Sequence, residues 1–157
     1  MIHPFPPLYH SDSNILILGS FPSVKSREQL FFYGHPQNRF WKVLSLVFND
    51  ILPQTIPEKK AFLQKHKIAL WDVIQSCEIT GSADSSIKNV TANDLSLILQ
   101  NSCVSKIFVN GKTAFKYYEK YTKPILNKEA ICLPSTSPAN AAFSLEKLVE
   151  AWSVITS

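Results

Sequence analysis

Four short apolar runs, each about the length of a β-strand, constrain the fold of this chain more than any other feature. They are Ile15–Leu18, Ile68–Trp71, Lys106–Asn110 and Ala130–Leu133. Continuous apolar runs suit strands that are buried on both faces, as in a parallel sheet covered by helices. Because helical patterns separate the runs, the sequence predicts a three-layer α/β/α sandwich with a mostly parallel four-stranded central sheet. We expect residues 1–157 to form one domain.

Capping residues and helical spacing predict where several helices begin. Thr55 with Glu58, and Thr91 with Asp94, each have the spacing of a capping box. We therefore expect one helix to run from Thr55 towards Lys67 and another to open at Thr91. A last helix is expected where apolar residues recur at helical spacing, at Leu145, Leu148, Val149 and Trp152.

In a sheet of this kind, ligands bind beyond the carboxyl ends of the strands. The segments expected there are the loops 19–36, 72–90, 110–112 and 134–142. Residues that fit neither a helix nor a strand gather in these loops. We therefore expect the functional site among them.

The most unusual stretch is residues 31–41, which read FFYGHPQNRFW. Gly34 and Pro36 interrupt any earlier regular structure. We therefore expect an apolar helix to begin near Gln37 or Asn38, where free backbone N–H groups favour a negative or hydrogen-bonding ligand. The side chains expected around this helix start are those of Tyr33, His35 and Asn38. The alternative is a turn with a capping amide and a core helix.

The composition excludes several classes of protein. Hydrophobic residues make up 45% and charged ones 18%, which argues against disorder. The net charge of +4 permits a polyanionic partner, and a solvated lysine surface would explain it equally. The three cysteines contain no C-x-x-C pair, so no zinc ribbon or iron–sulfur cluster is expected. With neither a signal peptide nor an apolar run of membrane-spanning length, we expect a cytoplasmic protein that enters no membrane.

Several kinds of catalysis do not fit the sequence. The turn at residues 110–113 (NGKT) is similar to a phosphate-binding loop, but Lys106 stands where that motif requires its first glycine. Metal catalysis needs several converging carboxylates. The loops offer only Asp72, Glu78 and Asp84. No G-x-S-x-G elbow occurs. We therefore expect no metal, no cofactor and no Ser-His-Asp triad.

The loops are rich instead in neutral hydrogen-bonding groups beside aromatic rings. The polar residues are Ser20, Ser23, Asn38, Ser135, Thr136, Ser137 and Asn140, and the rings are Phe21 and Tyr33. Amides and a ring suit a site that holds one nucleobase. They also suit departure of a base from its sugar, where a donor stabilises charge that builds on the base. The alternative is that these residues only satisfy backbone groups at the strand ends.

Residues 34–43 (GHPQNRFWKV) resemble the H-P-x-N-R-F-W-K-V segment of mismatch-specific uracil- and thymine-DNA glycosylases. The resemblance covers nearly the whole chain, and the best-matching group is the hypoxanthine (deoxyinosine) DNA glycosylase branch of the uracil-DNA glycosylase superfamily. Further matching segments are 19–23 (GSFPS), 71–74 (WDVI) with Cys77, 81–84 (GSAD), the turn Gly111-Lys112, 133–140 (LPSTSPAN) and 144–151 (SLEKLVEA).

The resemblance implies roles for individual residues. Asn38 matches the catalytic amide of the hypoxanthine branch, and Tyr33 matches the ring that stacks on the flipped base. Phe21 stands where the mismatch enzymes carry a water-positioning asparagine, and residues 135–137 replace a histidine of other branches. Both departures disfavour uracil removal. The DNA-wedge residues of the relatives have no clear counterpart in residues 138–142.

We therefore predict a monofunctional DNA glycosylase of base excision repair that removes hypoxanthine from double-stranded DNA, acts as a monomer and has no lyase activity. The residues predicted to contact the base are Ser20, Phe21, Pro22, Ser23, Tyr33, Gly34 and His35. Those predicted to contact DNA are Lys112, Ser135, Thr136, Ser137 and Asn140. The alternatives are removal of uracil or mismatched thymine, a catalytically silent nucleic-acid-binding module, and a flavodoxin-like small-molecule binder.

Overall fold

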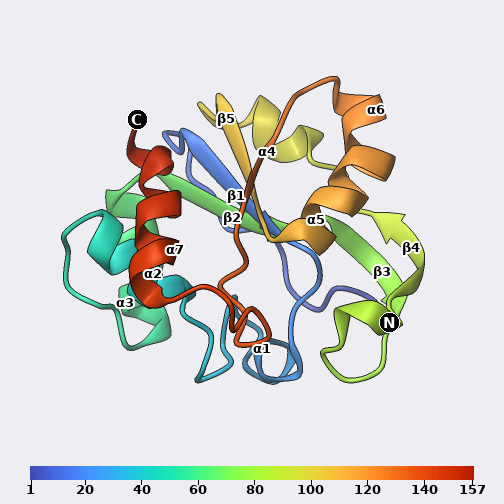
Figure 1. Cartoon of the computed structure of the whole chain (residues 1–157). Helices are drawn as coiled ribbons and strands as arrows, with labels where there is room; N and C mark the ends of the chain where they lie inside the picture. The colour runs from blue at the N-terminus through green and yellow to red at the C-terminus, as the bar shows by residue number, and fades with distance from the viewer.

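The computed structural model describes residues 1–157 and contains the predicted parallel sheet (Figure 1). Its four strands lie in the order β2-β1-β5-β6. Their bounds are Ile15–Gly19 (β1), Ile68–Asp72 (β2), Lys106–Asn110 (β5) and Ile131–Leu133 (β6). Every pair is parallel, with Ile15 opposite both Ile68 and Lys106. All four carboxyl ends therefore lie at one edge of the sheet.

Helices cover both faces of the sheet, which confirms the predicted three-layer architecture (Figure 1). On one face lie α2 (Phe40–Val47), α3 (Ile56–Lys65) and α7 (Leu145–Trp152), which continues as the short turn Ser153–Thr156. On the other lie α4 (Ser96–Gln100), α5 (Lys112–Tyr117) and α6 (Lys123–Leu126), with the π-helical turn Tyr118–Thr122 joining the last two.

Alternate residues of β1, β2 and β5 pack into two separate cores. Ile17 of β1 packs with Phe40 and Trp152 in one core, whereas Leu16 and Leu18 belong to the other. All five side chains are fully buried. Because successive side chains of a strand point to opposite faces, a strand between two helical layers needs apolar residues at every position. This is why the runs in the sequence are continuous rather than alternating.

A β-hairpin occupies much of the segment 72–90, which we predicted to be a loop. Strand β3 (Ile74–Glu78) pairs in antiparallel fashion with β4 (Lys88–Ala92), and the short 3₁₀ turn Asp84–Ser86 lies between them. The N-terminal segment also lies along β3, where the His3 N–H donates to the Gln75 carbonyl. The prediction was wrong because these pairings join segments whose own patterns are weakly apolar.

The helix starts confirm some capping predictions and correct others. Thr55 caps α3 and forms the complete capping box with Glu58. The helix predicted to open at Thr91 is wrong, because this residue lies in β4 and α4 begins only at Ser96. Helix α2 begins at Phe40 rather than at Gln37 or Asn38. The helix α1 (Val24–Gln29), capped by the Ser23 hydroxyl, was not predicted.

None of the helices combines the length and the apolar composition that crossing a bilayer requires.

Candidate active site

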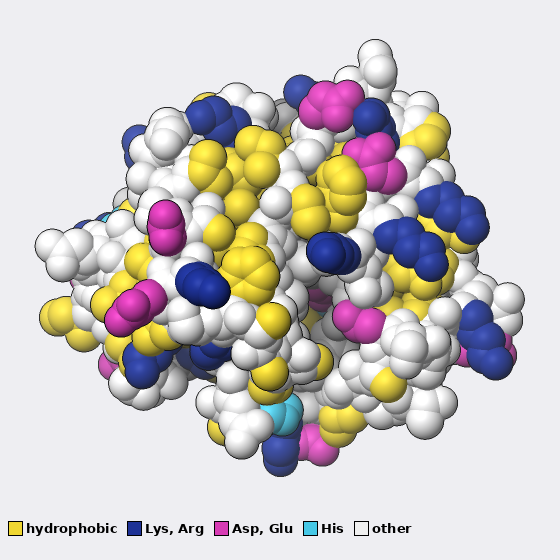
Figure 2. All heavy atoms as spheres, viewed as in Figure 1, with side chains coloured by type: hydrophobic (Ala, Val, Ile, Leu, Met, Phe, Trp, Pro, Cys, Tyr) yellow, Lys and Arg dark blue, Asp and Glu magenta, His cyan; other side chains and the backbone are white.

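A cavity of about 530 Å³ opens at the carboxyl edge of the sheet, where the predicted loops meet. Figure 2 shows a hollow near the centre of this face of the molecule. The cavity is lined by residues of 19–23, Ser26, Phe32, Tyr33, His35, Asn38, Asp72, 82–85, Asn110 and 135–139. Its position agrees with the rule that ligands bind beyond the carboxyl ends of parallel strands.

The Asn38 side chain is held in one orientation by two hydrogen-bond donors. Its Oδ1 atom accepts the Phe40 backbone N–H at 2.9 Å and the Thr136 hydroxyl at 2.8 Å. A backbone N–H can only donate, so the amide oxygen must face it. The Thr136 hydroxyl accepts from Asn110 Nδ2 at 3.0 Å, which directs its own hydrogen to Asn38. The Asn38 amide is therefore fixed by one contact from the start of α2 and one from the loop after β6.

The other end of the same amide is free. Asn38 Nδ2 donates to no protein atom, and the residue lines the cavity. Since both lone pairs of Oδ1 are occupied, the amide offers the cavity a donor and no acceptor. The site thus presents a fixed, uncharged N–H group to whatever binds there.

Tyr33 forms an aromatic wall of the cavity. Its ring lies parallel to the buried Phe40 ring, with centroids 3.9 Å apart and an interplanar angle of 14°. One ring face is thereby covered, and the ring lines the cavity. Tyr33 has a left-handed backbone conformation, with φ of 53°. Its hydroxyl lies close to Gly19, at the end of β1. Burial, together with the neighbouring Asp72 carboxylate, raises the pKa of its phenol, so this hydroxyl stays protonated.

Most of the residues predicted to contact the base do line the cavity. They are Ser20, Phe21, Pro22, Ser23, Tyr33 and His35, and Asn38 joins them. Gly34 does not line it. Its N–H donates to the Ser26 hydroxyl at 2.8 Å, and a Cβ there would stand 2.5 Å from Gln29 Oε1. Gly34 therefore permits close packing against α1.

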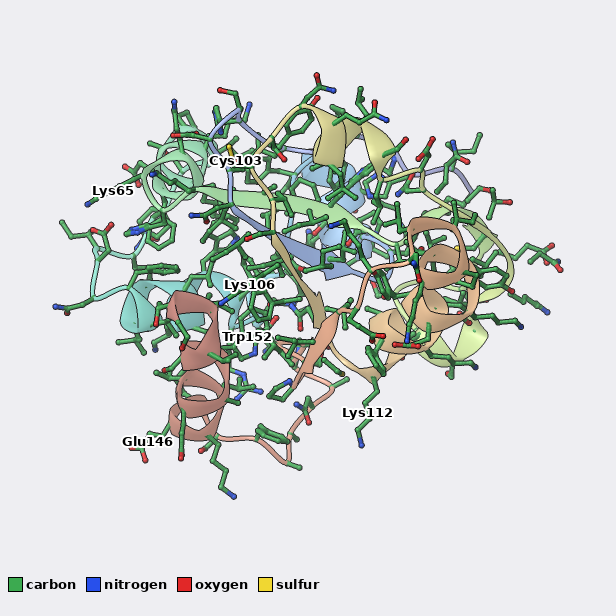
Figure 3. The ribbon with its side chains drawn as sticks, turned by 90° about the horizontal axis from the view of Figure 1, so that it is seen from above. Lys65, Cys103, Lys106, Lys112, Glu146 and Trp152 are labelled. Atoms are coloured by element: carbon green, nitrogen blue, oxygen red, sulfur yellow. The ribbon has the colours of Figure 1, made fainter.

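The residues predicted to contact DNA fall into three groups. Ser135 and Ser137 line the cavity. The Thr136 side chain is fully buried and holds Asn38, so it does not lie where phosphates would bind. Asn140 lies outside the cavity lining and its amide donates to the Ser135 carbonyl at 3.0 Å. Lys112 also lies outside the lining and extends away from the protein at the start of α5 (Figure 3).

Three further polar residues line the cavity although the sequence analysis did not predict them as site residues. Asn110 ends β5 and bonds Thr136, and Asp84 comes from the hairpin and accepts from the Ser20 hydroxyl at 3.4 Å. Burial raises the pKa of Asp84, partly offset by hydrogen bonds from Thr113 and Ser20. Asp72, at the end of β2, is the third. The signal available for Asp72 and Asn110 was their place directly at a strand end.

The fold and the site together define an α/β/α protein with a polar pocket, walled on one side by the Tyr33 ring, at the carboxyl edge of a parallel sheet. The family model that describes the uracil DNA glycosylase superfamily matches residues 6–156. The chain therefore belongs to the uracil DNA glycosylase superfamily, which confirms the resemblance noted from residues 34–43.

Individual relatives agree with this assignment. The chain is 35% identical to a hypoxanthine DNA glycosylase of Methanosarcina acetivorans, with 96% of this chain and 95% of the relative covered. It is 33% identical to a hypoxanthine DNA glycosylase of Methanosarcina barkeri, with 94% and 93% covered. The solution NMR structure of a candidate uracil DNA glycosylase from M. acetivorans superposes with a TM-score of 0.81, at 30% identity and with all of both chains covered.

Proposed function

We propose that this protein is a monofunctional DNA glycosylase that hydrolyses the N-glycosidic bond of hypoxanthine in double-stranded DNA. The observation that carries the proposal is the free Asn38 Nδ2 donor, held rigidly in a cavity that Tyr33 also lines. The two relatives described as hypoxanthine DNA glycosylases support the choice of base.

The extruded base would enter the cavity and stack on the ring face of Tyr33 that Phe40 leaves uncovered. As the bond between C1′ and N9 breaks, its electron pair moves to the base. Asn38 would donate to the base carbonyl oxygen and stabilise this charge, without any cost of reorienting the amide. The oxygen of a water molecule bonds to C1′ and the proton it loses balances the charge on the departing base, which leaves an abasic site.

The DNA strand would lie across the mouth of the cavity. Ser135 and Ser137 line the cavity, and Asn140 stabilises the same loop. Lys112 is an exposed cation on the turn between β5 and α5. Contacts from hydroxyls and a lysine to phosphates would position the duplex without reading its sequence. We propose that the protein acts as a monomer, in the cytoplasm, and that it associates with the nucleoid when it binds DNA.

The test compares wild type with Asn38→Asp and Asn38→Ala on duplexes that carry one hypoxanthine, uracil, xanthine or mismatched thymine. Release is read as strand breaks after alkali. We expect hypoxanthine to be the best substrate. Asn38→Asp keeps an acceptor for Phe40 N–H and the Thr136 hydroxyl but has no donor, so it should lose about 10²- to 10³-fold in rate, as should Asn38→Ala.

Thermal unfolding of both variants and their affinity for DNA serve as controls for folding. Wild-type rates with Asn38→Asp would show that the Nδ2 donor is not used. Preference for uracil or thymine would favour the corresponding glycosylase activity. Salt-sensitive DNA binding without release of any base would instead favour the silent binding module.

A further inference from the structure

A buried histidine–carboxylate pair stands behind the wall of the cavity, and the mechanism above does not use it. His3 Nε2 lies 2.7 Å from Asp72 Oδ2, and the two side chains are only 2% and 6% exposed. His3 comes from the N-terminal segment, which lies beside the β3–β4 hairpin (Figure 1). Buried polar groups that are paired in this way hold a fixed geometry.

The pair has a defined hydrogen-bond direction. The Phe5 backbone N–H donates to His3 Nδ1 at 3.4 Å, which places the ring hydrogen on Nε2 and directs it to the Asp72 carboxylate. The rings of Phe5, Phe21 and Trp71 meet the imidazole edge-on. These contacts hold the His3 imidazole in one orientation, and the imidazole in turn fixes one oxygen of the Asp72 carboxylate.

The second carboxylate oxygen faces the cavity. Asp72 lines the cavity, and its Oδ1 atom accepts no hydrogen bond from the protein. This oxygen lies over Gly19, where a Cβ would stand 2.4 Å from it and 3.1 Å from the Tyr33 hydroxyl. The absence of a side chain at Gly19 thus leaves room for an acceptor beside the ring on which the base would stack.

The cavity therefore holds a fixed acceptor, Asp72 Oδ1, and a fixed donor, Asn38 Nδ2. Hypoxanthine carries the complementary edge, with an N1–H donor next to the O6 acceptor. Adenine carries a lone pair at N1 instead, which an oxygen acceptor repels. The sugar and phosphates of an extruded nucleotide stay nearest the opening of the cavity. Because Asp72 is almost fully buried, its free oxygen would meet the base rather than the sugar.

Resting on the proposed function, we propose that Asp72, positioned by His3, accepts the N1–H of the flipped base and is the residue that selects bases with a ring N–H beside a carbonyl. Asp72 is then a specificity-determining residue, and His3 is a positioning residue that acts through it.

The test measures single-turnover release of hypoxanthine and of N1-methylhypoxanthine from single-stranded oligonucleotides, where base pairing plays no part. Wild type should prefer hypoxanthine by at least about 10-fold, because methylation removes the donor to a charged acceptor. Asp72→Ala should slow hypoxanthine release and bring the preference close to one. Asp84→Ala, which removes the other acid of the cavity, should keep the wild-type preference.

Two conservative variants, Asp72→Asn and His3→Gln, distinguish a change in base recognition from a folding defect. In Asp72→Asn, His3 would bind the amide oxygen and turn the amide nitrogen to the cavity, so release of hypoxanthine should fall relative to unsubstituted purine, whose N1 accepts. His3→Gln, which keeps a donor for Asp72, should retain more of the hypoxanthine preference than His3→Leu. Thermal unfolding is measured for every variant.

The outcomes separate this inference from the function on which it rests. If wild type releases hypoxanthine but Asp72→Ala slows both substrates equally, the inference is overturned and the proposed function stands. If wild type releases no hypoxanthine from any substrate, the proposed function fails, and the role of Asp72 fails with it.

Discussion

At the residue scale, the orientation of a single amide decides what this site can do. Asn38 could present either its oxygen or its nitrogen to the cavity, and the sequence does not distinguish the two. The Phe40 N–H and the Thr136 hydroxyl both occupy the oxygen, so the nitrogen remains for a ligand. Thr136, which we first expected to contact phosphate, is thus better explained as the residue that orients Asn38.

Thr136→Val tests this role, because it removes the hydroxyl and keeps the shape of the side chain. We expect the rate of base release to fall about 10-fold or more, since a loosened amide no longer meets the base in one geometry. Thr136→Ser keeps the hydroxyl and should stay near the wild-type rate. Single-turnover rates at saturating enzyme measure the effect, and equal rates for wild type and the valine variant would contradict it.

At the element scale, one arginine ties the loop after β6 to the start of α2. The Arg39 guanidinium donates to the Phe143 carbonyl at 2.6 Å and to the Asn140 carbonyl at 3.1 Å. Its backbone N–H also donates to the Thr136 carbonyl at 3.1 Å. The loop that lines one side of the cavity therefore has its position set by the residue next to Asn38.

Arg39→Met should loosen this loop. Because two charge-assisted hydrogen bonds are lost, we expect the free energy of unfolding to fall by about 2–3 kcal/mol and amide exchange in residues 137–143 to speed up. Lys42→Met, at an exposed position of α2, is the matched control and should change neither the free energy of unfolding nor the exchange. Chemical denaturation measures the free energy of unfolding, and hydrogen exchange measures the mobility of the loop. Unchanged exchange in residues 137–143 would contradict a role for Arg39 in holding this loop.

At the scale of the whole molecule, all four strands of the parallel sheet have their carboxyl ends at one edge, and the cavity lies between loops that follow different strands. Figure 3 shows Lys112 and Lys65 extending from different sides of the molecule. Lys112 opens α5 at the carboxyl end of β5, whereas Lys65 ends α3 just before β2 begins. Lys112 therefore lies at the edge of the sheet that carries the cavity, and Lys65 lies at the opposite edge.

Lys112→Gln should therefore weaken DNA binding and lower the slope of log affinity against log salt by about one. The rate of base release at saturating enzyme should stay unchanged, because the lysine lies outside the cavity. Lys65→Gln removes the same charge elsewhere and should leave the slope as in wild type. Fluorescence anisotropy over a salt series provides the measurement, and equal slopes for all three proteins would exclude a phosphate contact at Lys112.

What the sequence determined by itself is the part of the fold that local pattern controls. The buried strands, the capping box of α3 and the apolar face of α7 follow from residues that are close along the chain. The segment from Tyr33 to Asn38 also stood out, because a glycine and a proline interrupt regular structure between them. These features depend on propensity and periodicity, which a single chain displays before it folds.

Only the tertiary structure decided how the site is assembled. The β3–β4 hairpin forms where the N-terminal segment lies along β3. His3 and Asp72 are 69 residues apart, and Asn38 and Thr136 are 98 apart. Hydrogen bonds between such distant positions leave no local pattern, because each side chain acquires its partner only when the strand ends are brought together.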